Sequence, residues 1–226
     1  MSSSKLPAAI TLALLTTAAA VAGDARAQSC GMGEVDWYAN ERANVARADE
    51  MLQRGEPRRA AWLLQRTWPR LHEAVPVASS LPHIAEGVRL MALAAVRSNG
   101  DVQSSLGWSS WTPLERSLNV AWGVQRLRML VAADPSSGVA KTDLGEALSR
   151  SPRTRDEARR ILEALDASNA IASPEGYAAL ASLRIAGNDA AGAGLAAVEC
   201  QRHASNVAVQ CAAAVASVTP ALTATR

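Results

Sequence analysis

The sequence predicts an all-α protein built from antiparallel helix pairs. No stretch alternates apolar and polar residues as a half-buried strand does, and helix-starting and helix-ending residues recur at short intervals. The chain has 226 residues, 49% hydrophobic and 19% charged, which is typical of a globular domain rather than a disordered chain. Phe is absent and Ala is abundant, so we expect a core of small side chains and close helix contacts.

The charge composition argues against a nucleic acid partner. The net charge is only +2, and no long basic run exists. Nearly all positive charge is arginine, with lysine only at Lys5 and Lys141. We attribute this bias to coding composition rather than to a selected anion-binding surface.

Residues 1–27 are expected to be a secretory signal peptide. Lys5 precedes an uncharged apolar stretch at 6–22, and residues 25–27 form a small-x-small cleavage site. A retained membrane anchor and lipidation of Cys30 are the alternatives. No second long apolar segment follows, so we expect a periplasmic or secreted protein without stable membrane insertion after cleavage.

The expected segments follow from this leader and from the helix signals. They are a signal peptide at 1–27, a flexible mature N-terminus at 28–34, a helical domain at 35–218 with an inserted loop at 102–111, and a disordered tail at 219–226.

Export makes disulfides permissible. Cys200 and Cys211 flank a turn at 203–206, one on each helix of an antiparallel hairpin, which places their Cα atoms within bridging range. We therefore predict a Cys200–Cys211 disulfide, with Cys30 free, lipidated or paired with another chain. Zinc held by both cysteines and His203 is the alternative; it lacks an obvious fourth ligand, so we expect no metal.

Helix starts carry specific local signals. Residues 112–115, Thr-Pro-Leu-Glu, form a capping box with Pro at the first helical position, and residues 154–157 repeat the Thr and Glu of that device. Ser173 is a cap followed by Pro and Glu. Helix stops are expected at Gly55, Asn99-Gly100 and Gly187, where a left-handed residue can end a helix. Together these signals predict nine helices, near 35–54, 57–73, 82–98, 113–133, 138–150, 155–166, 174–186, 189–203 and 206–218.

Small residues recur in these helices with a period of about 34 residues. Small residues at positions eight and twenty of a helix pair allow two backbones to approach, and bulky residues at positions eleven and twenty-four fill the space beside them. The small positions are Ala48, Ala60, Gly123, Gly145, Ala158 and Gly192; the bulky ones include Met51, Leu64, Leu127, Leu148 and Leu162.

This pattern resembles the tetratricopeptide repeat, and residues 134–137, Asp-Pro-Ser-Ser, resemble the turn between two such repeats. The resemblance covers residues 41–206 and implies an α-solenoid of antiparallel helix pairs, whose first helices line a concave binding surface. The helix at 206–218 would then cap its C-terminal end. The sequence departs from the family at Leu93 and Leu180, which occupy positions where a small residue is expected, and at Glu199, which occupies a position where an apolar residue is expected. A non-repeating helical bundle is the alternative.

Two features of this expected solenoid are candidate binding sites. The inserted loop carries Trp108 and Trp111, which either pack back onto the solenoid or contact a partner. On the repeat register, the concave positions of the first helices would include Asp49, Gln53, Arg97, Glu146, Arg150, Tyr177 and Arg184. The arginines and the tyrosine there could clamp a carboxylate or an acidic peptide.

The sequence shows no catalytic or cofactor-binding motif. His72 and His83 flank a loop and are interpreted as solvated, and paired acids such as Asp156-Glu157 are explained by capping. We therefore expect no cofactor and no enzymatic activity. The predicted function is an exported adaptor or scaffold that binds a protein or peptide in the cell envelope; the alternative is an accessory subunit of a cell-envelope enzyme or a polysaccharide-handling complex.

Overall fold

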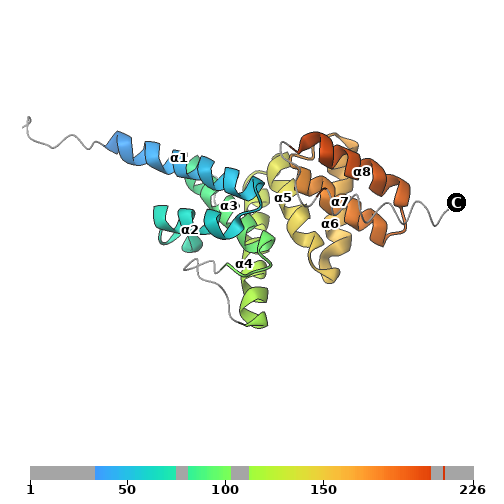
Figure 1. Ribbon diagram of the computed structural model, residues 1–226, viewed down its shortest axis with the longest axis horizontal. Coiled ribbons are helices and arrows are strands. Elements are labelled where there is room, and N and C mark those ends of the chain that lie inside the picture. Colours follow the sequence, from blue (N-terminus) through green and yellow to red (C-terminus); the bar gives the residue numbers. More distant parts are fainter. Residues whose placement is uncertain (1–33, 75–80, 103–111, 205–210, 212–226) are drawn as a thin grey trace, which may run out of the picture. The chain divides into compact units, whose positions relative to one another are not determined.

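The computed structural model describes residues 34–74, 81–102, 112–204 and 211, and all regular elements in that part of the chain are helical (Figure 1). The all-α prediction is therefore confirmed for these residues. Contacts divide the chain into two units, Met1–Ala39, of which the structure describes the start of α1, and Asn40–Arg226. The elements are α1 (Glu34–Gln53), α2 (Pro57–Thr67), η1 (Leu71–Glu73), α3 (Pro82–Arg97), α4 (Pro113–Ala133), α5 (Gly138–Ser149), η2 (Pro152–Thr154), α6 (Arg155–Ala167), α7 (Pro174–Ala186) and α8 (Ala190–His203), where η denotes a 3₁₀ turn.

Two of the predicted helix caps are confirmed. The Thr112 side chain accepts a hydrogen bond from the Glu115 N–H, and the Glu115 carboxylate accepts one from the Thr112 N–H at 2.9 Å. The Ser173 hydroxyl accepts a hydrogen bond from the Gly176 N–H at 3.1 Å. These bonds satisfy backbone donors that a helix leaves unpaired in its first turn.

The predicted cap of α6 at Thr154 and the predicted left-handed residue at Gly187 after α7 are both wrong. Thr154 does not cap α6: its hydroxyl donates to the Leu148 carbonyl oxygen at 2.6 Å, because η2 turns the chain before α6 begins. Gly55 takes a left-handed φ of +76° as expected, whereas Gly187 has φ −94° and Asn188 takes the left-handed conformation at +61°. Asn tolerates that conformation better than other residues with a Cβ atom.

The helix predicted at 57–73 is also shorter than expected. The helix α2 ends at Thr67, and residues 71–73 form the separate turn η1. Trp68 precedes Pro69, and the proline ring disfavours the helical conformation of the residue before it. Trp68 accordingly has φ −135° and ψ 94°.

From α2 onward, helices adjacent in the chain pack against each other. Contacts join α3 to α4, α5 to α6 and α7 to α8, and each of these pairs contacts the next through α4–α5 and α6–α7. The first helices of successive pairs, α3, α5 and α7, also contact one another in that order. Each of the first seven helices contributes a fully buried leucine to one continuous core: Leu52, Leu64, Leu90, Leu127, Leu148, Leu162 and Leu180.

Small residues lie at two of the predicted helix crossings. A Cβ atom on Gly123 of α4 would lie 2.8 Å from the Ala92 carbonyl oxygen of α3, and one on Gly145 of α5 would lie 2.6 Å from the Leu162 side chain of α6. Larger residues at these glycines would therefore separate the helices. Ala48, Ala60 and Ala158 are also fully buried.

In α8, the buried residues follow the predicted positions by one residue. The three atoms nearest to a Cβ atom on Gly192 would all belong to the Asp189 side chain, which caps the same helix. Ala193 and Cys200, one residue after the predicted positions, are instead fully buried. In α7, the repeat pattern expects a small residue at the position of Leu180. The next residue, Ala181, is small, and both are fully buried.

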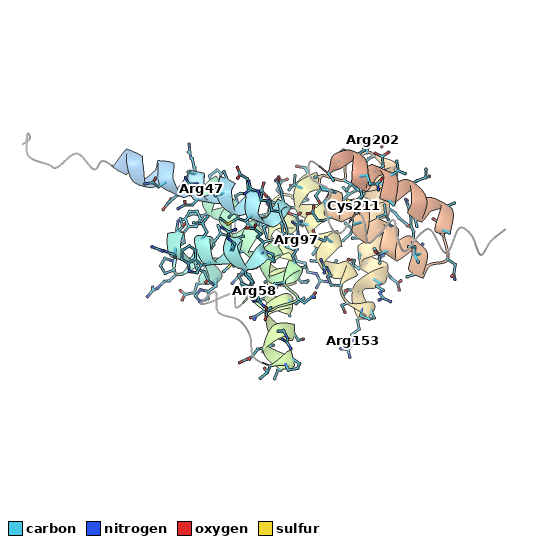
Figure 2. The ribbon with its side chains drawn as sticks, viewed as in Figure 1. Arg47, Arg58, Arg97, Arg153, Arg202 and Cys211 are labelled. Carbon is cyan, nitrogen blue, oxygen red and sulfur yellow. A yellow bond between two sulfur atoms is a disulfide. The ribbon has the colours of Figure 1, made fainter. Side chains whose placement is uncertain are left out.

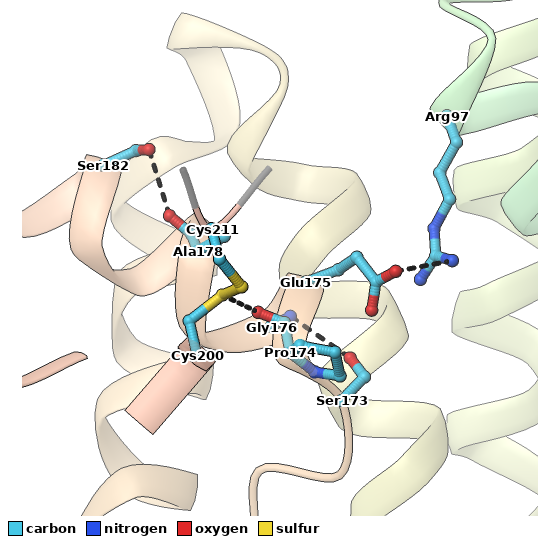
Figure 3. Close-up of a disulfide and its surroundings, with 9 residues drawn as sticks. All are labelled: Arg97, Ser173, Pro174, Glu175, Gly176, Ala178, Ser182, Cys200 and Cys211. Carbon is cyan, nitrogen blue, oxygen red and sulfur yellow. Dashed lines mark hydrogen bonds and ion pairs between the residues drawn. A yellow bond between two sulfur atoms is a disulfide. The ribbon is translucent and has the colours of Figure 1, made fainter. Parts of the chain in front are cut away.

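The structure joins Cys200 to Cys211, with their Cα atoms 5.7 Å apart, as the sequence predicts (Figure 3). Cys200 is fully buried, and its sulfur lies 3.0 Å from the Pro174 carbonyl oxygen at the start of α7. The disulfide therefore links Cys211, which follows α8 in the chain, to the place where the end of α8 packs against the start of α7.

Several expectations lie outside the described residues. They include the signal peptide, the state of Cys30, Trp108 and Trp111, the remainder of the helix at 206–218, and the tail at 219–226; of the segment expected to be flexible at 28–34, only Glu34 is described, and it belongs to α1. In the described ranges, no helix combines the length and apolar character needed to cross a membrane.

The Gly123 contact predicts a specific loss of stability. We expect Gly123→Ala to lower the free energy of unfolding by about 1–2 kcal/mol, because overpacking against the Ala92 backbone outweighs the better helix propensity of alanine. Denaturant unfolding measures this change. Ser117→Ala, on an exposed part of α4, is the control and should change stability by less than about 0.5 kcal/mol. An unchanged Gly123→Ala protein would show that α3 and α4 do not approach here.

The disulfide predicts a second stability change. It closes a short segment with a sequence separation of 11 residues. We expect reduction, or the Cys200→Ala/Cys211→Ala variant, to lower the free energy of unfolding by about 3 kcal/mol, because the unfolded chain gains freedom. Thermal unfolding with and without reductant tests this. Cys30→Ser should keep the full response to reductant, and a response that disappears in Cys30→Ser would assign the bond to another pair.

Candidate functional site

A cavity of about 290 Å³ opens among the first helices of the second unit, and we call it the charged cavity. Its lining comes from α1, α3, α5, the start of α7 and the segment that ends α8. Its ionisable lining residues are Asp49, Arg89, Arg97, Asp143, Glu175 and His203.

Arg97, at the C-terminal end of α3, holds two neighbouring helices. Its Nε and Nη2 donate to the two carboxylate oxygens of Glu146 on α5, at 3.0 and 2.9 Å. Its Nη1 lies 3.2 Å from Oε1 of Glu175 on α7 (Figure 3). The side chain is 7% exposed, in contrast to Arg153, which extends into solvent in Figure 2. A two-bond arginine–carboxylate pair fixes geometry as well as charge, so Arg97 sets how α3 meets α5 and α7.

Arg89, two helical turns earlier on α3, makes the second set of ion pairs. Its Nη1 donates to Asp143 of α5 at 2.6 Å, and its Nε and Nη2 donate to Glu86 at 2.8 and 2.7 Å. Asp49 of α1 lies further away, with 3.6 Å between its Oδ1 and the Arg89 Nη2. Arg89 therefore links α3 to α5 and brings Asp49 to the edge of the charged cavity.

The position of α5 explains why these charges are buried. Nearly all of its residues from Ala140 to Leu148 are inaccessible to solvent, including Asp143 and Glu146. A buried carboxylate without a partner is strongly unfavourable, so both need the arginines of α3.

Burial and pairing act on the protonation of these groups in opposite ways. Burial alone would lower the pKa of Arg89 and Arg97, but their carboxylate partners raise it above the ordinary value, so both stay charged. Burial raises the pKa of Asp143 to about 6 despite the Arg89 charge, and burial also raises the pKa of Glu175. Asp143 is therefore a member of this network that can titrate near neutral pH.

Local sequence brings Glu175 to the charged cavity. The Ser173 cap starts α7, and a Cβ atom on Gly176 would lie 2.4 Å from the Thr142 methyl group of α5. The Thr142 hydroxyl also accepts a hydrogen bond from the Ala172 N–H at 3.1 Å. Since only glycine permits this approach, Gly176 lets Glu175 reach Arg97.

The repeat register places Tyr177 on the binding surface, whereas its side chain is buried in the structure. It is 4% exposed and stacks on His203, with ring centroids 5.2 Å apart. Burial, with the nearby Glu199 and Asp166 charges, raises the pKa of its phenol group. The ring instead positions His203, which lines the charged cavity.

The structure brings three of the predicted binding residues together at the charged cavity, and the other predicted binding residues that it describes do not line that cavity. Asp49, Gln53 and Arg97 line the charged cavity. Arg150 lies behind it, 3.6 Å from Glu146, and does not line it. Arg184 donates to Asp166 at 2.7 Å and to the Gly192 carbonyl oxygen at 3.2 Å, so it holds α7 to its neighbours.

Sequence reasoning did not identify Arg89, Asp143 or Glu175 as site residues. One signal was present for Asp143, because Asp143, Glu146 and Arg150 have the i, i+3, i+7 spacing of a single helix face. Residues 144–148 of this helix are Leu, Gly, Ala and Leu apart from Glu146, and a charged face flanked by such residues indicates a buried ionic contact. For Arg89 and Glu175, the partners come from distant segments, and no local pattern identifies them.

The zinc alternative is not supported. Cys200 and Cys211 form the disulfide, which removes both thiolates from metal binding. Among the described residues, no three His, Cys, Asp or Glu side chains are arranged to hold a metal ion.

No protein-family model matches the chain, and neither curated proteins nor solved structures give a match. The tetratricopeptide resemblance therefore stays a prediction from sequence.

The raised pKa of Asp143 predicts a pH-dependent effect of its mutation. The folded protein binds this proton more tightly than the unfolded chain, whose carboxyl has the ordinary value of 3.8. The contribution of Asp143 to the free energy of unfolding therefore falls as pH rises from about 4 to above 6, by up to about 3 kcal/mol. Asp143→Asn cannot ionise, so its stability relative to wild type should rise by that amount over this window, as measured by denaturant unfolding.

Asp134→Asn is the matched control for this experiment. Hydrogen bonds from Ser136 lower the pKa of the exposed Asp134 carboxyl, so its contribution is present at neutral pH and is lost on acidification. The stability of Asp134→Asn relative to wild type should therefore fall with rising pH. A stability difference between Asp143→Asn and wild type that does not change with pH would contradict the raised pKa of Asp143.

Proposed function

We propose that this protein is an exported, non-enzymatic adaptor whose helix pairs form a tetratricopeptide-like α-solenoid, and that it binds a segment of a cell-envelope protein at the charged cavity. The observation that carries the proposal is the cavity itself. Charged side chains from α1, α3, α5 and α7 converge there, although these helices are far apart in the sequence.

The order of helix contacts supports the solenoid part of the proposal. Each pair contacts the next, and the first helices of successive pairs contact one another, as expected for stacked repeats. The close contacts of Gly123 and Gly145 support the same arrangement, because they lie between the two helices of a pair.

Rigid positioning of the cavity residues supports a binding role. Ion pairs hold Arg89 and Arg97 on both sides, and Tyr177 stacks on His203. A preorganised surface loses little conformational entropy when it binds a partner. At about 290 Å³, the cavity is close to the lower limit of small-molecule pockets and suits one side chain of a larger partner.

Site-specific photo-crosslinking in the native host tests this function. A photoreactive amino acid at Gln53 or Val139, both exposed at the charged cavity, should give the same discrete adduct with a protein partner. The control position is Gln125, which is exposed on α4 and does not line the cavity. It should give no such adduct.

The outcomes separate the proposed function from its alternatives. Adducts that form equally at Gln125, or no adduct at either cavity position, would contradict partner binding at the charged cavity. Mass spectrometry identifies the adduct. A catalytic envelope subunit would favour the accessory-subunit function, and crosslinking to glycan alone would favour polysaccharide handling.

A further inference from the structure

The arginines of the charged cavity have little hydrogen-bonding capacity left for a ligand. The guanidinium of Arg97 is bonded to Glu146 on one side and lies against Glu175 on the other. Arg89 is held by Glu86 and Asp143. An incoming carboxylate would have to displace a buried carboxylate and leave it without a partner, which is costly. The acidic ligand expected from the sequence therefore does not suit this cavity.

The surroundings of the cavity carry an excess of negative charge. The carboxylates of Asp49, Glu86, Asp143, Glu146 and Glu175 all lie within ion-pair distance of arginine. The guanidiniums that face them belong to Arg89, Arg97 and Arg150, so the carboxylates in these ion pairs outnumber the guanidiniums by two.

Of the carboxylates that line the cavity, Asp49 is the most exposed. Its side chain is 40% exposed and 3.6 Å from Arg89, and its Oδ2 accepts a hydrogen bond from the exposed Gln53 amide at 2.8 Å. By contrast, Asp143 and Glu175 are nearly buried behind it. A donor group that enters the cavity would therefore meet carboxylate oxygens.

One wall of the cavity is apolar. Leu93, Val139, Pro174 and Ala204 line it beside the charges, and Val139 is 44% exposed. Lysine and arginine side chains combine an apolar stem with a cationic head, and they pack the stem along apolar surface while the head reaches polar partners.

We propose that the charged cavity binds one lysine or arginine side chain of the partner, with its cationic head at Asp49 and its stem against the apolar wall. This inference rests on the proposed function, because it specifies which part of a protein partner the cavity recognises.

The test uses four blocked tripeptides as probes, with lysine, arginine, glutamate or norleucine between two glycines. Norleucine has a stem similar to that of lysine without the charge. Chemical-shift titration of the ¹⁵N-labelled, disulfide-intact protein at neutral pH reports where each probe binds. The lysine and arginine probes should cause saturable shifts of the Gln53, Val139 and Ser173 amides, and the other two probes should not.

A pair of charge-removing variants locates the cationic head. Asp49→Asn should weaken binding of the lysine probe roughly fivefold, because a charge-assisted hydrogen bond is lost at a half-exposed site. Glu50→Gln, the next residue on α1, removes the same charge at a side chain that pairs with Arg54 and does not line the cavity. It should leave the affinity unchanged. Amide spectra show whether each variant keeps the fold.

Several results would overturn the inference. They are equal or stronger binding of the glutamate probe, equal binding of the norleucine probe, shifts confined to residues away from the cavity, no saturable shift at all, or equal losses in Asp49→Asn and Glu50→Gln. Failure here is distinguishable from failure of the proposed function. A partner crosslinked at Gln53 through a segment without lysine or arginine would keep the adaptor and reject the cationic side chain.

Discussion

The buried ion pairs between α3 and α5 are the constraint on which the rest of the second unit depends. The helix α5 is enclosed along most of its length, so Asp143 and Glu146 cannot be solvated and must meet Arg89 and Arg97. Replacing a whole buried ionic network with apolar residues can be neutral or stabilising, whereas removing one partner costs about 3–5 kcal/mol. We therefore infer that this network determines which helices pack together, and that it adds little net stability. The charged cavity is a consequence of that packing.

Features that depend on a few neighbouring residues could be predicted from the sequence. The caps at Thr112 and Ser173 and the Cys200–Cys211 pair follow from local spacing, and the structure has all three. Features that depend on rotation of a helix about its axis could not. One residue turns a helix by about 100°, so a register read from sequence does not fix which side chains are enclosed, and Tyr177, expected on the binding surface, is buried.

In the candidate site too, some features could be predicted from the sequence and others depend on how distant segments pack. Asp49, Gln53 and Arg97 were predicted because the repeat register places them on first helices, and all three line the charged cavity. The sequence could not show that the binding capacity of Arg97 is already used by Glu146 and Glu175, because those residues follow it by dozens of positions. Helical spacing indicates which charges share a face, but only the packing of distant segments determines which charges neutralise one another.

His203 and Ala204, which line the charged cavity, lie inside the ring that the Cys200–Cys211 bond closes. Oxidation therefore completes one wall of the cavity covalently. Without this bond the segment would lack that restraint, so the proposed partner would meet the complete surface only after the two thiols are oxidised. Under the proposed function, the state of the thiols would therefore set when the partner is recognised.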